Sequence, residues 1–368
     1  MIIQRYINLE IFYRLIWITV LLTLIFTTNK FVDYLADAAA GKIPSQYVFS
    51  LLWHRILAMQ AEVMPLLVFL AMILAFARLN QDNELAVLGA AGMGKKFQIK
   101  VALKFCLVYS ILLAYVAFFA EPWAKMQLEV LKTQAWKDAS ITALTSGKFK
   151  ELDNGKSVVY VEHLSDDNKL MKNVFLQTPD KGKDSVLRAD TAYLKYDQDS
   201  GNRFIIFENG RRYEGEPGWA DYQITQYARY GALIETQPER DNTGNIEAMS
   251  TADLLVTDSS HAVAELQWRL SSIIASFVLC CLAVLLNQYP FSQKPFTLLL
   301  IGILIYFIYN NLLSISDALV LRDKLPGYIG LWWVHLLAIA ITVAIYRVSV
   351  FAAKRKMNGD VEVLARDA

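Results

Sequence analysis

The chain has 368 residues, of which 55% are hydrophobic, and its mean hydropathy is +0.31. A soluble domain of this length needs more polar cover for its surface, so the composition indicates a membrane protein. The net charge of +1 gives no attraction for an acidic polymer, which argues against nucleic acid as a partner. All 3 cysteines lie in apolar runs, so we expect neither a disulfide framework nor a CxxC metal site.

Apolar runs flank one long polar block. Residues 15–28, 61–77 and 101–120 precede the block at 121–261, and residues 270–286, 296–313 and 331–350 follow it. Each run approaches the roughly 20 residues that a helix needs to cross about 30 Å of hydrocarbon. We therefore expect an α-helical membrane protein with six transmembrane helices and a polar domain inserted between helices 3 and 4. An odd number of crossings on each side places that domain opposite the termini.

Lysine and arginine in the short loops orient the chain. One face collects Arg5, Arg14, Arg78, Lys95, Lys96, Lys100, Lys294, Arg347, Lys354, Arg355, Lys356 and Arg366. Outside the polar block, the other face has Lys30, Lys42, Arg322 and Lys324. The positive-inside rule makes the first face cytoplasmic, so we expect cytoplasmic termini and an outer polar domain.

A cleaved signal peptide is the rival interpretation of the amino terminus. It is disfavoured because charged residues separate the first apolar run from the alanines at 38–40.

These runs predict four parts. Residues 1–120 form a first membrane half with a cytoplasmic helix at about 80–92, and residues 121–262 form the outer domain with a helical stalk. A second membrane half covers 263–352, and a cytoplasmic tail covers 353–368. Lys30 is expected at the outer end of the first span. It could snorkel to headgroups, or it could contact the phosphate of a lipid entering from the outer leaflet.

The loop at 78–100 contains a short amphipathic helix. Leu85 and Leu88 fall on one face, beside Glu84. Asn80 or Asp82 can cap the start of this helix, and Gly89 or Gly92 can end it. Such a helix could dock in a groove on a soluble partner or rest on the membrane surface, and the residues alone favour the membrane surface.

The same loop resembles a phosphate-binding G-x-x-x-x-G-K-[ST] motif from Gly89 to Lys96. Its last position is lysine, so the hydroxyl that would hold Mg²⁺ is missing, and a helix precedes it where a strand is required. We reject ATP binding by this chain.

The sequence also lacks the residues of a metal or catalytic site. The four histidines have no metal-ligand spacing, and the sequence has no nucleophile, base and orienter arrangement. We expect no catalytic residue, metal or cofactor.

Within the polar block, short strand-like runs alternate with turn signals. The runs are 157–162, 173–177, 186–196, 204–207, 212–214 and 222–230, and Gly turns are expected at 153–155, 180–182, 199–201 and 208–210. This spacing predicts an antiparallel sandwich or roll. Arg212 begins one of the strands, and an arginine at the end of a strand is usually exposed to solvent.

Glu265 and Arg269 are one turn apart at the start of the fourth span and can pair.

Several motifs resemble those of the LptF/LptG family of lipopolysaccharide export permeases. They are Met1-Ile-Ile-Gln-Arg-Tyr6, Glu84-Leu-Ala-Val-Leu-Gly-Ala-Ala-Gly92, Gly147-Lys-Phe149, Val158-Val-Tyr-Val-Glu162, Asn209-Gly-Arg-Arg-Tyr-Glu-Gly215, Ala264-Glu-Leu-Gln-Trp-Arg269 and Gly330-Leu-Trp-Trp-Val-His335. The first resembles the start of the LptF members of the family. The resemblance covers almost the whole chain. Residues 287–294 depart from it, because the family usually has a Pro-Leu and a Pro-Arg-x-Gly-Arg stretch there.

The resemblance implies an inner-membrane permease subunit of an ABC transporter that extracts lipopolysaccharide from the outer leaflet. Its implied partners are the paralogous permease LptG, two copies of the ATPase LptB, and LptC. It also implies a periplasmic β-jellyroll that passes the lipid to a periplasmic bridge.

The same resemblance implies roles for particular residues. Glu84 would sit in the ATPase groove, with Leu85 and Leu88 as apolar anchors. Lys30 would face the lipid phosphates, Arg269 is a weaker lipid-binding candidate, and Arg212 would couple the periplasmic domain to LptC or to the membrane part. The alternative is a membrane scaffold or mechanotransmitting permease-like regulator of a periplasmic enzyme, which generally has four spans.

Overall fold

The computed structural model describes residues 2–366 except 41, 143–145, 153–156, 166–169, 181–182, 197–202, 216–222, 236–245 and 289–293. In this part of the chain, six helices are long and apolar enough to cross a membrane, three before and three after a block of strands. The expected class, a helical membrane protein with an inserted β domain, is confirmed. A first compact unit comprises Met1–Asn29, Trp53–Gln127 and Thr243–Ala368, and a second comprises Lys30–Leu52 and Leu128–Asn242.

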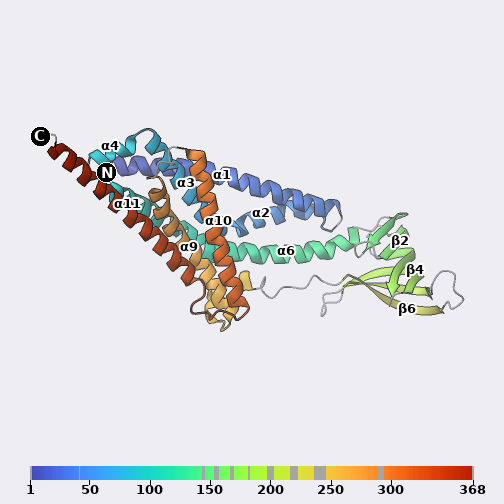
Figure 1. Ribbon diagram of the computed structural model, residues 1–368. Coiled ribbons are helices and arrows are strands. Elements are labelled where there is room, and N and C mark those ends of the chain that lie inside the picture. The colour runs from blue at the N-terminus through green and yellow to red at the C-terminus, as the bar shows by residue number, and fades with distance from the viewer. Residues whose placement is uncertain are drawn as a thin grey trace. The chain divides into compact units, whose positions relative to one another are not determined.

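The helices before the strands are α1 (Ile2–Ala39), α2 (Val48–Ala58), α3 (Gln60–Gln81), α4 (Glu84–Ala90), α5 (Lys95–Tyr115) and α6 (Glu121–Thr142). A 3-10 turn, η1 (Ser45–Tyr47), precedes α2, and a π-helical segment, η2 (Val116–Ala120), joins α5 to α6. After the strands come α8 (Thr251–Val256), α9 (Ser260–Leu286), α10 (Pro295–Leu321) and α11 (Trp332–Arg366), as Figure 1 shows.

Helices α3 and α9 form the centre of the first unit. Buried alanines on α3 and buried alanine and serine residues on α9, such as Ala71, Ala75, Ser276 and Ala283, leave room for the backbones to approach. Phe69 and other large side chains fill the space between these helices and α5 and α10. Close packing of this kind replaces the hydrophobic driving force that helices lack inside a bilayer.

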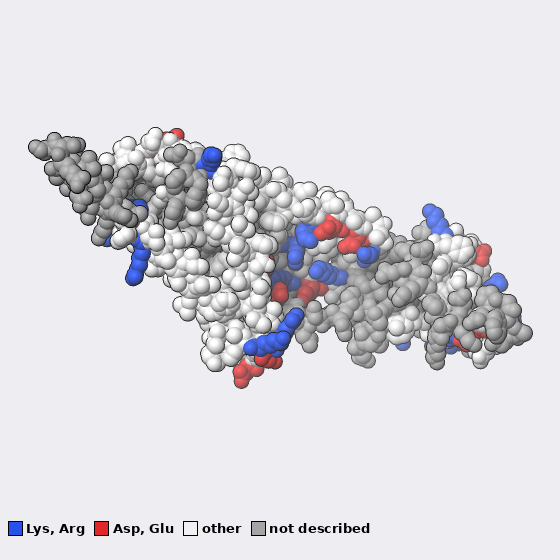
Figure 2. Space-filling model, in the orientation of Figure 1, with Lys and Arg blue, Asp and Glu red and all other residues white. Residues whose placement is uncertain are grey.

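The outer helices expose most of their apolar surface. Only 11% of the most apolar window of α1 is buried, and the same is true of α11, whereas the figure for α3 is 72%. On the visible face of the described helices, a wide continuous surface is uncharged (Figure 2). An exposed apolar surface of this extent is suited to lipid or to another membrane chain.

Both termini lie at the same end of the first unit, and α4 lies there too (Figure 1). Two contacts fix this arrangement. The hydroxyl of Tyr6 donates to a carboxylate oxygen of Glu84 at 3.0 Å, and Lys95 Nζ donates to the carbonyl oxygen of Ser349 at 3.1 Å. The region between the second and third spans therefore meets the first turns of α1 and the middle of α11.

The strands form one antiparallel sheet whose order follows the sequence, a six-stranded meander. The strands are β1 (Phe149–Leu152), β2 (Ser157–Leu164), β3 (Leu170–Asp180), β4 (Lys183–Tyr196), β5 (Arg203–Glu214) and β6 (Gln223–Glu235). Alternate residues such as Val159, Val161, Leu187 and Phe207 point to one face and bury one another. The inserted β domain is thus present, and its strands pair with their sequence neighbours, where a Greek key would pair non-consecutive ones.

The turn predicted at 208–210 is wrong, because β5 runs through it. Glu208 pairs with Thr191 and Gly210 pairs with Ala189, while Asn209 adopts a φ of +53° between them. Pairing on both sides of β5 overrides the local turn preference of Asn-Gly. The turns predicted at 153–155 and 199–201, and all but the first residue of 180–182, lie outside the described residues.

Lys30 lies inside helix α1, which continues to Ala39. The start of another helix differs from expectation. Helix α4 begins at Glu84, and the residue before it, Asn83, has a left-handed φ of +59°. The N-cap position is therefore Asn83, and neither Asn80 nor Asp82 caps the helix. Asparagine adopts this left-handed conformation more readily than most residues, which explains the boundary.

Gly210 generates a prediction for the stability of the sheet. A Cβ at this position would meet the hydroxyl of Tyr227 and the carbonyl oxygen of Arg188. We expect Gly210→Ala to destabilise the sheet by about 1–3 kcal/mol, since the backbone atom cannot move aside. Amide hydrogen exchange of β4–β6 in the full-length protein measures this. Gly231→Ala is the matched control, because its Cβ meets only the flexible end of Ile206 at 3.3 Å. Equal protection in both variants would contradict the prediction.

Candidate functional site

Helix α4 has one face attached to the membrane spans and one face exposed. Leu85 and Leu88 are partly buried and pack against the apolar core of the first unit. Val87 points away, with 68% of its surface exposed, and its neighbours Ala86 and Ala90 are exposed as well. The two leucines that the sequence groups on one face therefore anchor the helix to its own chain, and the opposite face is open.

A charged network ties α4 to α1 and α3 through Arg78. The Arg78 guanidinium donates to the Tyr6 hydroxyl at 2.9 Å and forms an ion pair with Asp82 at 3.0 Å. It also lies 3.4 Å from a carboxylate oxygen of Glu10 and 3.7 Å from one of Glu84. Because Tyr6 and Arg78 both contact Glu84, α4 is linked to the start of α1 and to the last turn of α3.

Lys30 lies on α1 and forms an ion pair with Asp33, one turn further along the same helix. Its ammonium group is 2.8 Å from a carboxylate oxygen of Asp33, and both side chains are exposed. An exposed pair of this kind contributes at most about 1 kcal/mol and exchanges readily with other partners. Lys30 is therefore available to an anionic group that competes with Asp33.

Arg269 is committed to contacts within the chain. Only 3% of its surface is exposed, and its guanidinium donates to Glu265 at 2.8 Å and to Thr251 Oγ1 at 2.8 Å. It also donates to the backbone carbonyl oxygens of Glu247 and Met249, at 3.1 and 3.0 Å. The predicted pairing of Glu265 with Arg269 is thus found. The other contacts fasten the segment before α8 to the start of α9.

A second cation continues this polar cluster. Lys125 on α6 is 2.8 Å from Glu121 and 3.2 Å from Glu247. Glu247 therefore meets Lys125 through its side chain and Arg269 through its backbone. Buried charges are tolerated when they are paired and hydrogen-bonded, so this cluster fixes three helices and the returning segment together.

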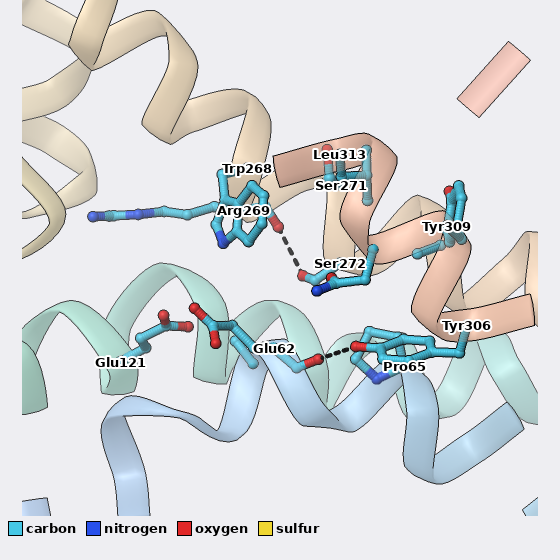
Figure 3. Close-up of a pocket in the computed structure, with 13 residues that line it drawn as sticks. Glu62, Pro65, Glu121, Trp268, Arg269, Ser271, Ser272, Tyr306, Tyr309 and Leu313 are labelled. Atoms are coloured by element: carbon cyan, nitrogen blue, oxygen red, sulfur yellow. Dashed lines mark hydrogen bonds between the residues drawn. The ribbon is translucent and has the colours of Figure 1, made fainter. Parts of the chain in front are cut away.

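A pocket beside this cluster is small. Figure 3 shows Glu62 and Glu121 on one side and Tyr306 and Tyr309 on the other, with the Arg269 side chain pointing away. The Tyr306 hydroxyl donates to the Glu62 carbonyl oxygen at 2.7 Å. The cavity volume is about 30 Å³, enough for about one water molecule and far too small for a lipid. This pocket is a packing feature.

Arg212 holds three strands of the sheet together. Its guanidinium donates to Ser185 on β4 at 3.0 Å and to the Tyr230 hydroxyl on β6 at 2.6 Å, and it pairs with Glu214 on β5. It also stacks over the Tyr230 ring at 5.3 Å. The solvated state expected for a strand-end arginine is wrong, because Arg212 lies on the apolar face opposite Leu187.

Tyr227 is the tyrosine that covers Gly210. Burial raises the pKa of its hydroxyl to about 12. The phenol therefore stays protonated at neutral pH and donates to the carbonyl oxygen of Arg188 at 3.3 Å.

In the described part of the chain, no group of three or more histidine, cysteine, aspartate or glutamate side chains could hold a metal ion.

The structure brings in residues that the sequence reasoning missed. Lys125 follows Glu121 by four residues on a helix, a spacing that signals an ion pair and could have been recognised. Tyr6 and Arg78 could not, because they lie 78 and 6 positions from Glu84 and only the helix packing brings all three together. Of residues 287–294, the stretch from 289 to 293 lies outside the described residues.

Comparison with known proteins gives a match over almost the whole chain. A family model of lipopolysaccharide export system permeases, LptF/LptG, matches residues 5–348. Two curated relatives are each named "Lipopolysaccharide export system permease protein LptF", one from Escherichia coli (strain K12) and one from Shigella flexneri. Each is 29% identical over 348 residues, covering 94% of this chain and 94% of the relative.

Arg269 generates a prediction about the segment before α8. We expect Arg269→Met to release this segment, because two backbone carbonyl oxygens and Glu265 lose their donor. Leaving a buried carboxylate unpaired costs about 3–5 kcal/mol. Limited proteolysis of the full-length protein in detergent should show cleavage at 246–256 at least tenfold faster. Arg269→Lys retains the charge and should be intermediate; unchanged cleavage in Arg269→Met would refute the clamp.

Proposed function

Because the chain belongs to the LptF/LptG family of lipopolysaccharide export permeases, we propose that it is one half of an ATP-driven extractor of lipopolysaccharide from the inner membrane. The transport subunit itself is a multi-pass membrane protein with six candidate spans in the described residues. In the proposal, a paralogous permease, LptG, completes the membrane part. Two copies of the ATPase LptB supply the energy, and LptC receives the lipid.

The proposed orientation has both termini in the cytoplasm and the β domain in the periplasm. Three candidate spans on each side of the strands support it, since an odd number of crossings returns both termini to one side. The lysines and arginines around α4 and at residues 354–366 support the cytoplasmic assignment of that side. The proposed domain limits, 1–120, 121–262, 263–352 and 353–368, follow the same logic.

The observation that carries the proposal is the construction of α4. One face is held by Leu85 and Leu88 on the membrane core, while Glu84 is linked to α1 and α3 through Tyr6 and Arg78. The other face, around Val87, is apolar and exposed. A helix docked on a soluble ATPase through this face would pass a movement directly to the spans. We assign the coupling role to Glu84, Leu85 and Leu88, with Val87 as the contact.

Extraction needs such an external source of work. Lipopolysaccharide has several acyl chains and anionic phosphates, and exposure of apolar surface costs about 25 cal/mol per Å². Withdrawing several chains from a bilayer therefore costs many kcal/mol. The sequence has no complete nucleotide-binding motif, so hydrolysis is assigned to the partner, and the sheet supplies an apolar face on which chains can be sheltered.

The remaining candidate residues divide into two roles. We assign Lys30 to the lipid phosphates, because its ion pair with Asp33 is exposed and therefore weak. Arg269 is better suited to holding the α8 segment than to binding lipid, since its donors are occupied. Arg212 would couple the periplasmic domain to LptC by keeping β4, β5 and β6 rigid. A membrane scaffold is the alternative, but six candidate spans exceed the four usual for such regulators.

Variants of α4 test the proposed coupling. We expect Val87→Glu to lower copurification of the ATPase at least tenfold, because it places a charge in an apolar contact. Glu84→Ala should weaken copurification and lower lipid-stimulated ATP hydrolysis. Arg78→Gln is the matched control for transmission, since it leaves the exposed face intact and should lower hydrolysis while the ATPase stays bound. Normal binding and activity in all three variants would rule out coupling through α4.

Photocrosslinking tests the role of Lys30. We expect Lys30→Glu to reduce crosslinking to lipopolysaccharide more than crosslinking to phospholipid, because a carboxylate repels the phosphates. Asp33→Asn frees Lys30 from its ion pair and should keep or increase the lipopolysaccharide signal. An equal loss for both lipids in Lys30→Glu would mean that the lysine only snorkels to headgroups.

Affinity purification in mild detergent tests the proposed function as a whole. The purified complex should contain the paralogous permease, the ATPase and lipopolysaccharide together. Recovery of the chain with a periplasmic enzyme and without an ATPase or lipopolysaccharide would favour the scaffold alternative.

A further inference from the structure

The first turns of α1 and the middle of α5 line an open groove. The groove has a volume of about 590 Å³. Arg5, Leu9 and Phe12 line it from α1, and Lys104 and Val108 line it from α5. This volume falls within the range of small-molecule sites, unlike the pocket beside Glu62.

The two cations of the groove have no protein partner within the described part of the chain. Arg5 and Lys104 are both exposed, and neither forms an ion pair or a side-chain hydrogen bond with a described residue. Nearby cations behave differently, since Arg14 and Arg78 are both paired with Glu10. The two free cations therefore converge on one groove from two helices.

The groove changes from charged to apolar along both helices. On α1, Leu9 and Phe12 follow Arg5 at spacings that keep all three on one face, and Phe12 is 48% exposed. On α5, Val108 follows Lys104 by one turn and is 71% exposed. Both helices begin at the end of the unit that contains α4 and the termini (Figure 1). The cations thus lie nearer that end, and the apolar walls extend toward the middle of the spans.

We propose that this groove binds an anionic glycerophospholipid of the leaflet nearest the amino terminus. The phosphate lies between Arg5 and Lys104, and an acyl chain lies along Phe12 and Val108. Basic pockets between membrane helices on the cytoplasmic side suit anionic headgroups, and charge-assisted contacts to phosphate are strong ones. A zwitterionic lipid brings its own cation close to the two basic side chains and is disfavoured.

This site is separate from lipopolysaccharide extraction. The proposed function takes lipopolysaccharide from the opposite leaflet, beyond the other ends of the spans. Only the leaflet assignment rests on the topology proposed above, whereas the affinity for an anionic lipid rests on the groove itself. The bound lipid would fill the groove between α1 and α5 and so connect the two helices.

Native mass spectrometry of the purified full complex tests the proposal, with phosphatidylglycerol and phosphatidylcholine as probes. We expect phosphatidylglycerol to bind at least tenfold more tightly than phosphatidylcholine. The double variant Arg5→Gln/Lys104→Gln should lower phosphatidylglycerol binding at least tenfold and leave phosphatidylcholine binding unchanged. The matched control is Lys96→Gln/Lys100→Gln, which removes the same charge from exposed positions on α5 outside the groove and should bind as the wild type does.

A third variant tests the apolar wall without changing charge. Val108→Trp fills the groove from an exposed position and should lower phosphatidylglycerol binding severalfold. It also keeps the test decisive if the double variant does not fold. Equal binding of the two lipids, or equal loss in the control pair, overturns the proposal. Lipopolysaccharide retained in the same spectra reports separately on the proposed function, so the two ideas can fail independently.

Discussion

Hydrocarbon offers the peptide backbone no hydrogen-bonding partner, and the organisation of this chain follows from that constraint. Each candidate span is a helix because a helix satisfies its own amide and carbonyl groups. The sheet is inserted between the third and fourth spans as a separate compact unit, with its own buried core. The edge strands of a sheet cannot face lipid, because their free amide and carbonyl groups would have no hydrogen-bonding partner there. The spans are therefore helical, and the sheet lies in a separate part of the chain.

The helical part then needs a way to hold helices that no hydrophobic effect drives together. Small residues on α3 and α9 allow close packing at the centre. Arg269 and Lys125 add a polar cluster that joins α6, α9 and the returning segment. This division of labour leaves α1, α10 and α11 with apolar surfaces for lipid and for a second membrane chain.

The proposed function requires that work from outside the membrane reaches a lipid inside it. Helix α4 suits this proposal because one of its faces is packed on the spans and the other is exposed. Its leucines pack against the spans and Glu84 accepts a hydrogen bond from Tyr6, whereas Val87 is exposed. Under the proposal, these contacts pass a displacement of α4 to α1 and α3, whereas a loop lying loosely on the membrane would absorb it.

Composition and periodicity by themselves determined the six spans, the inserted β domain and the short helix with Glu84. These are local properties, since about 20 apolar residues or an alternating run identify an element without reference to the rest of the chain. The Glu265–Arg269 pair was predictable for the same reason, because its spacing is one helical turn.

Only the tertiary structure decided which groups meet. It placed Leu85 and Leu88 inward, joined Tyr6 and Arg78 to Glu84, and committed Arg269 to backbone carbonyls. It also continued β5 through the Asn-Gly pair that signals a turn. Each of these outcomes depends on partners distant in sequence, whose packing and hydrogen bonds outweigh a local preference of about 1 kcal/mol.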